Sequence, residues 1–276
     1  MAENIRKPAV AGTFYAGSPQ SLDREVATYL KNVPDSVFQP SRLFGIISPH
    51  AGYSCSAPTA AYGFRLMYKF PVKTVIVIAP SHSDYFQGVS IFHGEGYETP
   101  LGVVPVDVDL CQRLKSNSKN AILSAVGHQS EHSLEVQLPF LQKIYPDGFN
   151  LVPITVGVTT AEDLREFAEA LFNTTAGEQV MVVASSDLSH YYPHEIACRK
   201  DAHFIKLLED YDLESLGQGY DDQSLEACGL GPILVLMHYA DHSGQAKCKS
   251  LDYRTSGDTC SSKSQVVGYV SAVVYE

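Results

Sequence analysis

The chain has 276 residues, of which 45% are hydrophobic and 18% are charged. This composition is typical of a globular protein and excludes an intrinsically disordered chain, and no apolar run approaches the roughly 18 residues of a membrane span. The 20 basic and 31 acidic residues leave a net charge of −11. Because no run of Lys or Arg could follow a phosphate backbone, we expect neither nucleic acid nor a membrane as a partner.

The N-terminus and the cysteines together predict a cytoplasmic protein. The first residues, MAENIRKPAVAGTFYAG, lack the apolar segment of a signal peptide. The six cysteines are widely spaced and form no C-x-x-C pair, which argues against a disulfide framework and against a zinc ribbon. We therefore expect most of the cysteines to be free thiols.

Short apolar runs alternate with amphipathic segments, which predicts a single domain over residues 1–276. The predicted fold class is three-layer α/β/α around a mixed, largely parallel central sheet. Runs rich in Val and Ile predict central strands at 43–47, 74–79, 150–156 and 179–184. Amphipathic segments predict helices at about 57–69, 107–116, 131–145, 160–172, 195–209 and 230–241. Alternating segments at 246–255 and 266–275 predict an antiparallel pair at a sheet edge. Thr159 and Glu162 have the spacing of a helix capping box.

Polar side chains follow three of the predicted strands. His50 follows the first strand in SPHAGY, His82 follows the second in PSHSD, and Asp187 and His190 follow the fourth in SSDLSHYYP. In open α/β sheets, ligands bind in the crevice beyond the carboxyl ends of the strands. Pro49 and Pro80 stiffen these turns, and Gly52 lets the backbone bend behind His50. We therefore predict a metal site that contains His50 and His82.

A catalytic metal site commonly uses three protein ligands and leaves one position open. Cys228, in LEACGLGPILVLMHY, directly precedes an apolar helix, where the helix dipole and free N–H groups would favour a thiolate. It is the best cysteine candidate for the third ligand, and its alternative role is that of a small buried residue. Cys55 could instead reach the same crevice.

A second cluster lies in GHQSEHSLEVQLPF. His128, Glu131 and His132 match the H-x-x-E-H pattern of inverted zinc peptidases, in which both histidines share one helical face. Ser130 resembles an N-cap, which would leave His128 outside the helix. His132 and Glu135 could then point into the crevice as proton-transfer or orienting groups. The chain has no G-x-S-x-G elbow, phosphate loop, dinucleotide fingerprint or H-E-x-x-H motif.

The motifs PAVAGTFYAG, SPHAGY, PSHSD, EHSLEVQLPFL, SSDLSHY and CGLGPI occur in this order in the Memo family, which the sequence resembles along essentially its whole length. The resemblance implies a fold like that of class III extradiol dioxygenases, the non-haem Fe(II) enzymes that open catechol rings with O₂. It implies that His50, His82 and Cys228 bind the metal, and that Asp187 and His190 line the pocket with His132 nearby. AMMECR-type and radical-SAM proteins are the implied partners, because bacterial and archaeal members belong to the AmmeMemoRadiSam system.

True extradiol enzymes use a carboxylate as the third ligand, whereas this chain offers a cysteine. Fe(II) is the first expectation, and a His₂Cys set would also bind Cu or Zn. The leading hypothesis is a metal-dependent oxidoreductase, dioxygenase-like, that acts on a small-molecule or peptide-linked aromatic substrate. In it, His190 oriented by Asp187, or else His132, carries a proton.

Two alternatives stay open at this point. One is a non-catalytic metal- or peptide-binding module of the Memo type, although a phosphopeptide site would need an Arg cluster and basic residues are sparse around the motifs. The other is a zinc peptidase or amidase that uses His128 and His132.

Overall fold

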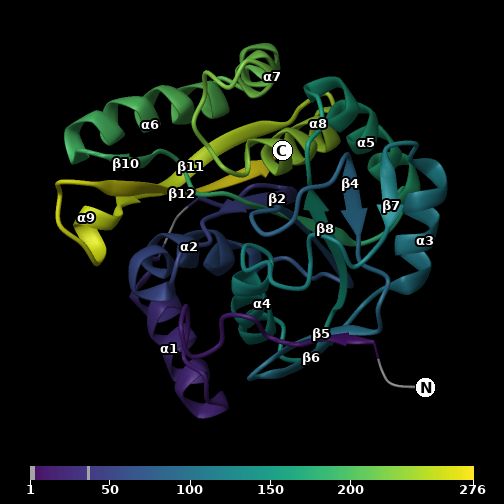
Figure 1. Cartoon of the computed structure of the whole chain (residues 1–276), viewed down its shortest axis with the longest axis horizontal. Coiled ribbons are helices and arrows are strands. Elements are labelled where there is room, and N and C mark those ends of the chain that lie inside the picture. Colours follow the sequence, from purple (N-terminus) through teal and green to yellow (C-terminus); the bar gives the residue numbers. More distant parts are fainter. Residues whose placement is uncertain (1–3, 36–37) are drawn as a thin grey trace.

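The structure is a computed structural model that describes residues 4–35 and 38–276. A nine-stranded mixed sheet forms its middle layer in the order β10-β12-β2-β9-β3-β8-β4-β7, with β11 paired to β12 (Figure 1). The inner strands β2, β9, β3 and β8 are parallel, whereas β12 and β4 pair with them in antiparallel fashion. The predicted fold class, a largely parallel mixed sheet between helices, is confirmed. The strands of this sheet are β2 (Leu43–Ser48), β3 (Thr74–Pro80), β4 (Val89–Ile91), β7 (Ala121–Leu123), β8 (Asn150–Val156), β9 (Val180–Ser185), β10 (His190–Tyr192), β11 (Lys247–Thr255) and β12 (Val266–Tyr275).

The register of the parallel strands brings their carboxyl ends to one edge of the sheet. Ser48 of β2 pairs with Ser185 of β9, and Ile78 of β3 pairs with Ala184. Every residue of β2 and β3 is buried, as expected for parallel strands covered on both faces. The loops that follow β2, β3 and β9 therefore emerge side by side.

Helices cover both faces of the sheet. On one face α2 packs against β2 and β12 and contacts α1 and α4. On the other face α8, which is buried along nearly its whole length, packs against β9, β2 and β3 and contacts α5 and α7. α6 covers β11 and β12, and α3 lies beside α5. The helices are α1 (Pro19–Asn32), α2 (Tyr53–Met67), α3 (Val108–Asn117), α4 (Leu138–Ile144), α5 (Ala161–Thr174), α6 (His194–Glu209), α7 (Leu213–Asp221), α8 (Leu230–Asp241) and α9 (Ser256–Thr259).

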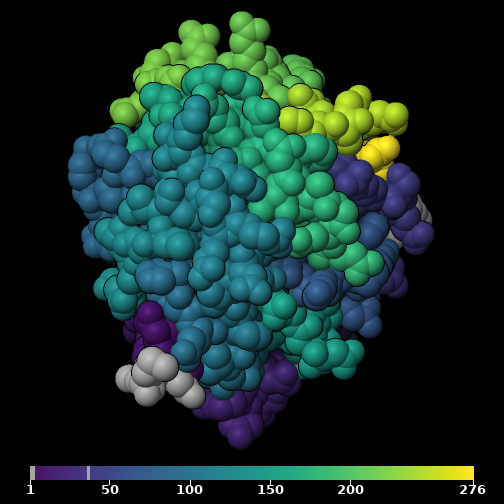
Figure 2. Space-filling model, turned by 90° about the vertical axis from the view of Figure 1, so that its right-hand side faces the viewer, coloured from purple at the N-terminus to yellow at the C-terminus, as the bar shows by residue number. Residues whose placement is uncertain are grey.

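A second, three-stranded sheet lies outside the main one and was not predicted. It consists of β1 (Ile5–Arg6), β5 (Gly96–Thr99) and β6 (Gly102–Pro105) in the order β1-β5-β6. Viewed from the side of β4, β7 and α3, the middle of the chain covers most of the surface, and the N-terminal part appears at the lower end (Figure 2). Among the described residues, no helix is both long enough and apolar enough to span a membrane.

Several predicted elements differ in detail. The predicted helix at 131–145 is a 3₁₀ turn, Glu135–Gln137, followed by the short α4, so that residues 131–134 form a loop. The N-cap of α5 is Thr160, whose side chain accepts from the Asp163 backbone N–H; the predicted Thr159–Glu162 box is one residue out of register. The predicted C-terminal antiparallel pair is confirmed as β11 and β12.

The connection between β11 and β12 carries a covalent link that the sequence did not indicate. Cys55, in the first turn of α2, and Cys260, directly after α9, form a disulfide. Cys111, Cys198, Cys228 and Cys248 are free. Most cysteines are thus thiols as expected, but the expectation that Cys55 could serve the crevice is wrong.

Candidate metal centre

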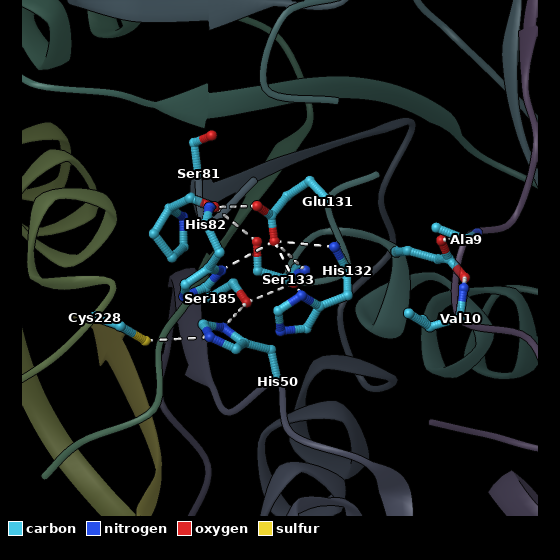
Figure 3. Close-up of polar contacts among 12 residues, drawn as sticks. Ala9, Val10, His50, Ser81, His82, Glu131, His132, Ser133, Ser185 and Cys228 are labelled. Carbon is cyan, nitrogen blue, oxygen red and sulfur yellow. Dashed lines mark hydrogen bonds and ion pairs between the residues drawn. The ribbon is translucent and has the colours of Figure 1, made fainter. Parts of the chain in front are cut away.

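Three imidazoles meet at the carboxyl edge of the parallel strands. His50 follows β2, His82 follows β3, and His132 lies in the loop before α4. The potential ligand atoms of these three rings all lie within 4.8 Å of one another, and Figure 3 shows the rings facing the same space. His50 is buried, whereas His82 is exposed and His132 is half-buried. The arrangement therefore has one interior donor and an open side.

Each ring is held through its Nδ1 atom. His50 Nδ1 lies 2.8 Å from Ser185 Oγ at the end of β9. His82 Nδ1 and His132 Nδ1 lie 3.0 and 3.3 Å from the same Glu131 carboxylate oxygen. Metal-bound histidines are commonly oriented in this way, because a partner on one ring nitrogen leaves the other free for the ion. Nε2 is therefore the nitrogen that each ring can offer to a metal.

Glu131 organises this site, a role that the sequence analysis missed. Its carboxylate accepts from the backbone N–H groups of His82, His132 and Ser133. Burial would raise its pKa, but the hydrogen bonds from His82 and Ser133 outweigh burial and hold the pKa below its ordinary value. Glu131 is therefore a carboxylate that positions two rings. The available signal was an acidic residue directly beside a candidate histidine, because metal-bound histidines often pair with carboxylates.

Burial keeps the two less exposed imidazoles neutral at pH 7. Burial, together with the neighbouring His82 and His132 rings, holds the pKa of His50 well below its ordinary value. Burial also lowers the pKa of His132, although Glu131 opposes this effect. Neutral imidazole is the form that binds a metal or accepts a proton.

Cys228 lies beside the histidine group, directly before α8. Its Sγ is 3.2 Å from His50 Nε2 and 3.2 Å from the Asp187 backbone nitrogen, which donates to it. Burial and the nearby Asp187 carboxylate raise the pKa of this thiol. The expected thiolate at a helix start is therefore not the form that the protein favours without a cation.

Asp187 and His190 occupy different positions around the site. Asp187 accepts from the His50 backbone N–H at 2.7 Å, and burial raises the pKa of its carboxyl to about 7, against the lowering effect of that hydrogen bond. The His190 ring instead hydrogen-bonds to the backbone of Leu188, and burial lowers its pKa. The recorded contacts of Asp187 thus position His50, whereas the sequence analysis expected it to orient His190.

A family model described as a Memo-like protein matches residues 6–273. The chain belongs to the Memo-like family. A MEMO1 family protein of Saccharolobus islandicus is 35% identical over 280 residues, which cover 97% of this chain and 98% of the relative. Another, from Nitrosopumilus maritimus, is 33% identical over 268 residues, 96% of this chain and 98% of the relative. An uncharacterized protein of Escherichia coli K12 has a solved structure with a TM-score of 0.52 at 18% identity, covering 83% of this chain and 99% of that one. This likeness concerns the fold alone.

The structure of this Memo-like chain does not support the zinc-peptidase pattern. His128 lies in the interior, with Nδ1 2.5 Å from the Tyr97 hydroxyl and Nε2 3.2 Å from the Ser90 carbonyl. It does not belong to the histidine group of the described residues, and no helix spans 128–132. The shared helical face that the H-x-x-E-H pattern requires is absent.

Glu135 also points away from the crevice of the Memo-like chain, contrary to expectation. It forms a fully buried ion pair with Arg6 and accepts from the Tyr15 hydroxyl at 2.5 Å. Arg6 donates to the carbonyl oxygens of Glu131 and His128 as well. The N-terminal segment is therefore fastened to the loop that carries His132, and the Phe14 ring packs against the His132 ring with centroids 4.9 Å apart.

A pocket of about 430 Å³ opens beside His82 and Cys228. This volume is within the usual range for small-molecule sites. Tyr85, Phe86 and Tyr220 line it, and the described lining includes Asp84 but neither Lys nor Arg. A phosphate-bearing ligand would find no cationic side chain there.

Proposed function

We propose that this Memo-like protein is a metal-dependent oxidoreductase whose site binds a single non-haem Fe(II) through His50, His82 and Cys228. The observations that carry the proposal are the grouping of His50 and His82 with His132, with one ligand atom of each ring within 4.8 Å of the others, and the 3.2 Å between Cys228 Sγ and His50 Nε2. Cu or Zn would suit the same soft and borderline donors, so the ion itself needs measurement.

Cys228 lies within ligand distance of one of the two proposed histidine ligands, although the group of ligand atoms that lie within 4.8 Å of one another comprises His50, His82 and His132 and does not include Cys228. Two ligand atoms at typical zinc distances of about 2.1 and 2.3 Å from one ion lie about 3.1 Å apart when they subtend a right angle. The 3.2 Å between Cys228 Sγ and His50 Nε2 matches this separation. Deprotonation of the thiol would accompany metal binding, since only a thiolate is a good ligand.

His132 and His190 are the groups of this chain that we assign to proton transfer. Both have a lowered pKa because of burial, so both are neutral at pH 7 and able to accept a proton from a bound substrate. Fe(II), when bound, would supply the one-electron chemistry that O₂ requires. The aromatic walls of the pocket, Tyr85, Phe86 and Tyr220, favour a planar aromatic substrate.

The test is to purify the protein without oxygen, measure bound metals by mass spectrometry, and follow oxygen uptake with catechols, phenols and indoles. We expect about one iron per chain and turnover with at least one class. Cys228→Ser should lose the iron, whereas the matched control Cys198→Ser, a free cysteine on α6, should keep it. Full iron retention in Cys228→Ser would refute the ligand assignment, and a metal-loaded protein without oxygen uptake would refute the oxidoreductase.

A further inference from the structure

The Cys55–Cys260 disulfide joins two parts of the chain that flank the metal centre. Cys55 lies five positions after His50, in the first turn of α2. Cys260 follows α9, in the connection between β11 and β12. In Figure 1, α9 lies at the end of the β11–β12 pair, with α6 and β10 on one side and α2 on the other, and α2 contacts α9.

The segment that carries His190 rests partly on this connection and partly on the adjoining ends of β11 and β12. Leu188 and His194 donate their backbone N–H groups to the Gly268 and Lys263 carbonyl oxygens at 2.8 and 3.0 Å. The His194 ring lies 2.9 Å from the Thr255 hydroxyl. His190 itself pairs with β12 at Val267. The disulfide thus links the α2 start, next to His50, to the support of His190.

The α9 segment packs against α2, β11 and β12 but buries little of its own surface. α9 is four residues long and only its Ser256 is buried. Its own hydrogen bonds are mostly local, such as those from the Cys260 and Ser261 N–H groups to the Ser256 carbonyl. A segment with few buried contacts opens readily unless it is tied down. The covalent link is therefore a major constraint on this segment.

We propose that Cys55 and Cys260 form a reversible redox-modification site that controls how firmly His190 is held at the metal centre. The modifying partner is a dithiol reductant. Its thiolate attacks the sulfur of Cys260, an exposed residue, and releases Cys55 as a thiol; its second thiol then displaces Cys260. The bridge gains two electrons and two protons and becomes two thiols, while the reductant becomes a disulfide.

Reduction leaves the metal-binding imidazoles in place, because Ser185 and Glu131 hold them independently of α9. It loosens the 255–264 connection and, through it, the 188–194 segment. The regulatory consequence rests on the proposed function, since slower turnover is expected only if His190 carries a proton. The structural consequence does not depend on that function.

The experiment compares backbone hydrogen exchange by mass spectrometry in the oxidised protein, in the protein treated with dithiothreitol under native conditions, and in Cys55→Ser/Cys260→Ser. We expect exchange at 188–194 and 255–264 to become at least tenfold faster in both reduced forms, with β2, β3 and β9 unchanged and metal content unaltered. Cys111→Ala, which removes a free thiol on α3, should exchange at these two segments like the oxidised wild type.

Unchanged exchange at 188–194 after complete reduction would overturn the proposal, as would a bridge that dithiothreitol reduces only in denaturant. The two proposals also fail separately. If reduction makes hydrogen exchange faster but the protein binds no metal, the redox-site proposal is supported and the oxidoreductase proposal is refuted. If the protein binds iron and is active, but neither its hydrogen exchange nor its turnover rate changes on reduction, the oxidoreductase proposal stands and the redox-site proposal is refuted.

Discussion

Replacing Glu131 with Gln tests the organisation of the metal centre directly. One Glu131 carboxylate oxygen contacts the His82 ring Nδ1 and accepts hydrogen bonds from the backbone N–H groups of His132 and Ser133. The other oxygen accepts a hydrogen bond from the backbone N–H of His82. A glutamine of the same size has only one acceptor oxygen. In either amide orientation its NH₂ group would face at least one N–H donor, so a buried hydrogen bond becomes a donor–donor contact.

The expected loss of metal affinity follows from the two rings that Glu131 orients. Removal of a group that orients a metal-bound histidine typically costs about 10- to 100-fold in affinity, which is roughly 1.4 to 2.7 kcal/mol. We place Glu131→Gln within this range, because its carboxylate holds Nδ1 of the proposed ligand His82 and lies beside the His132 ring as well. The unfolding free energy should also fall by about 1–3 kcal/mol, the usual cost of an unsatisfied buried polar group.

The assay is an anaerobic competition titration of Fe(II), and of Co(II) as a spectroscopic substitute, against a chromophoric chelator. Circular dichroism establishes the temperature range in which the metal-free variant is folded, and affinity is measured within it. Glu162→Gln is the control, since Glu162 is an exposed residue on α5 that forms an ion pair with Arg165. Wild-type affinity, within a factor of two, in folded Glu131→Gln would refute this view of the site.

Further predictions concern stability and the remaining donors. Burial lowers the pKa of His128 from 6.5 to about 3, so its contribution to stability is complete above pH 6.5 and is lost as the pH falls toward 3. Urea unfolding should therefore show that this group makes the protein about 2 kcal/mol less stable at pH 5 than at pH 7.5. His128→Gln should remove this part of the pH dependence, and an unchanged difference between the two pH values in the variant would contradict the assignment. Reduction of Cys55–Cys260, which closes a sequence separation of 205 residues, should lower the unfolding free energy by up to roughly 5 kcal/mol; denaturant midpoints that coincide with and without dithiothreitol would argue against it. His82→Ala should abolish stoichiometric metal binding without unfolding the protein, because the His82 side chain is 37% exposed and its loss leaves no closed cavity in the core. Retention of one metal per chain would exclude His82 as a ligand.

The central strands and the polar residues that follow them were predictable for the same physical reason. A parallel strand buried on both faces must be apolar throughout, so β2, β3, β8 and β9 stand out as runs of Val and Ile. Parallel strands also end at one edge, which brings His50 and His82 together from positions far apart in the sequence. The rule that ligands bind at this edge then locates the site without any knowledge of side-chain contacts.

The parts that were not predictable depend on contacts between distant loops. Glu131 lies in irregular chain, and its role arises only when the loop packs against His82, 49 positions earlier. The pull of Glu135 toward Arg6, rather than into the crevice, requires the N-terminal segment to fold back across 129 positions. Periodicity describes the neighbours of a residue along a helix or strand, and it carries no information about such pairings.

The disulfide also bears on where the chain functions. Disulfides persist in oxidising compartments and are rare in a reducing cytosol, where those present are commonly transient or redox-sensing. A permanent structural bridge between Cys55 and Cys260 would not fit a reducing setting. A bridge that opens and closes would fit, because Cys260 is an exposed residue and a dithiol reductant can exchange with an accessible disulfide. Alkylation of intact cells before lysis, followed by peptide mass analysis, distinguishes a switchable bridge from a permanent one. A mixture of bridged and free cysteines whose ratio shifts with oxidant supports a cytoplasmic switch. Full oxidation under all conditions indicates a structural bridge in an oxidising compartment.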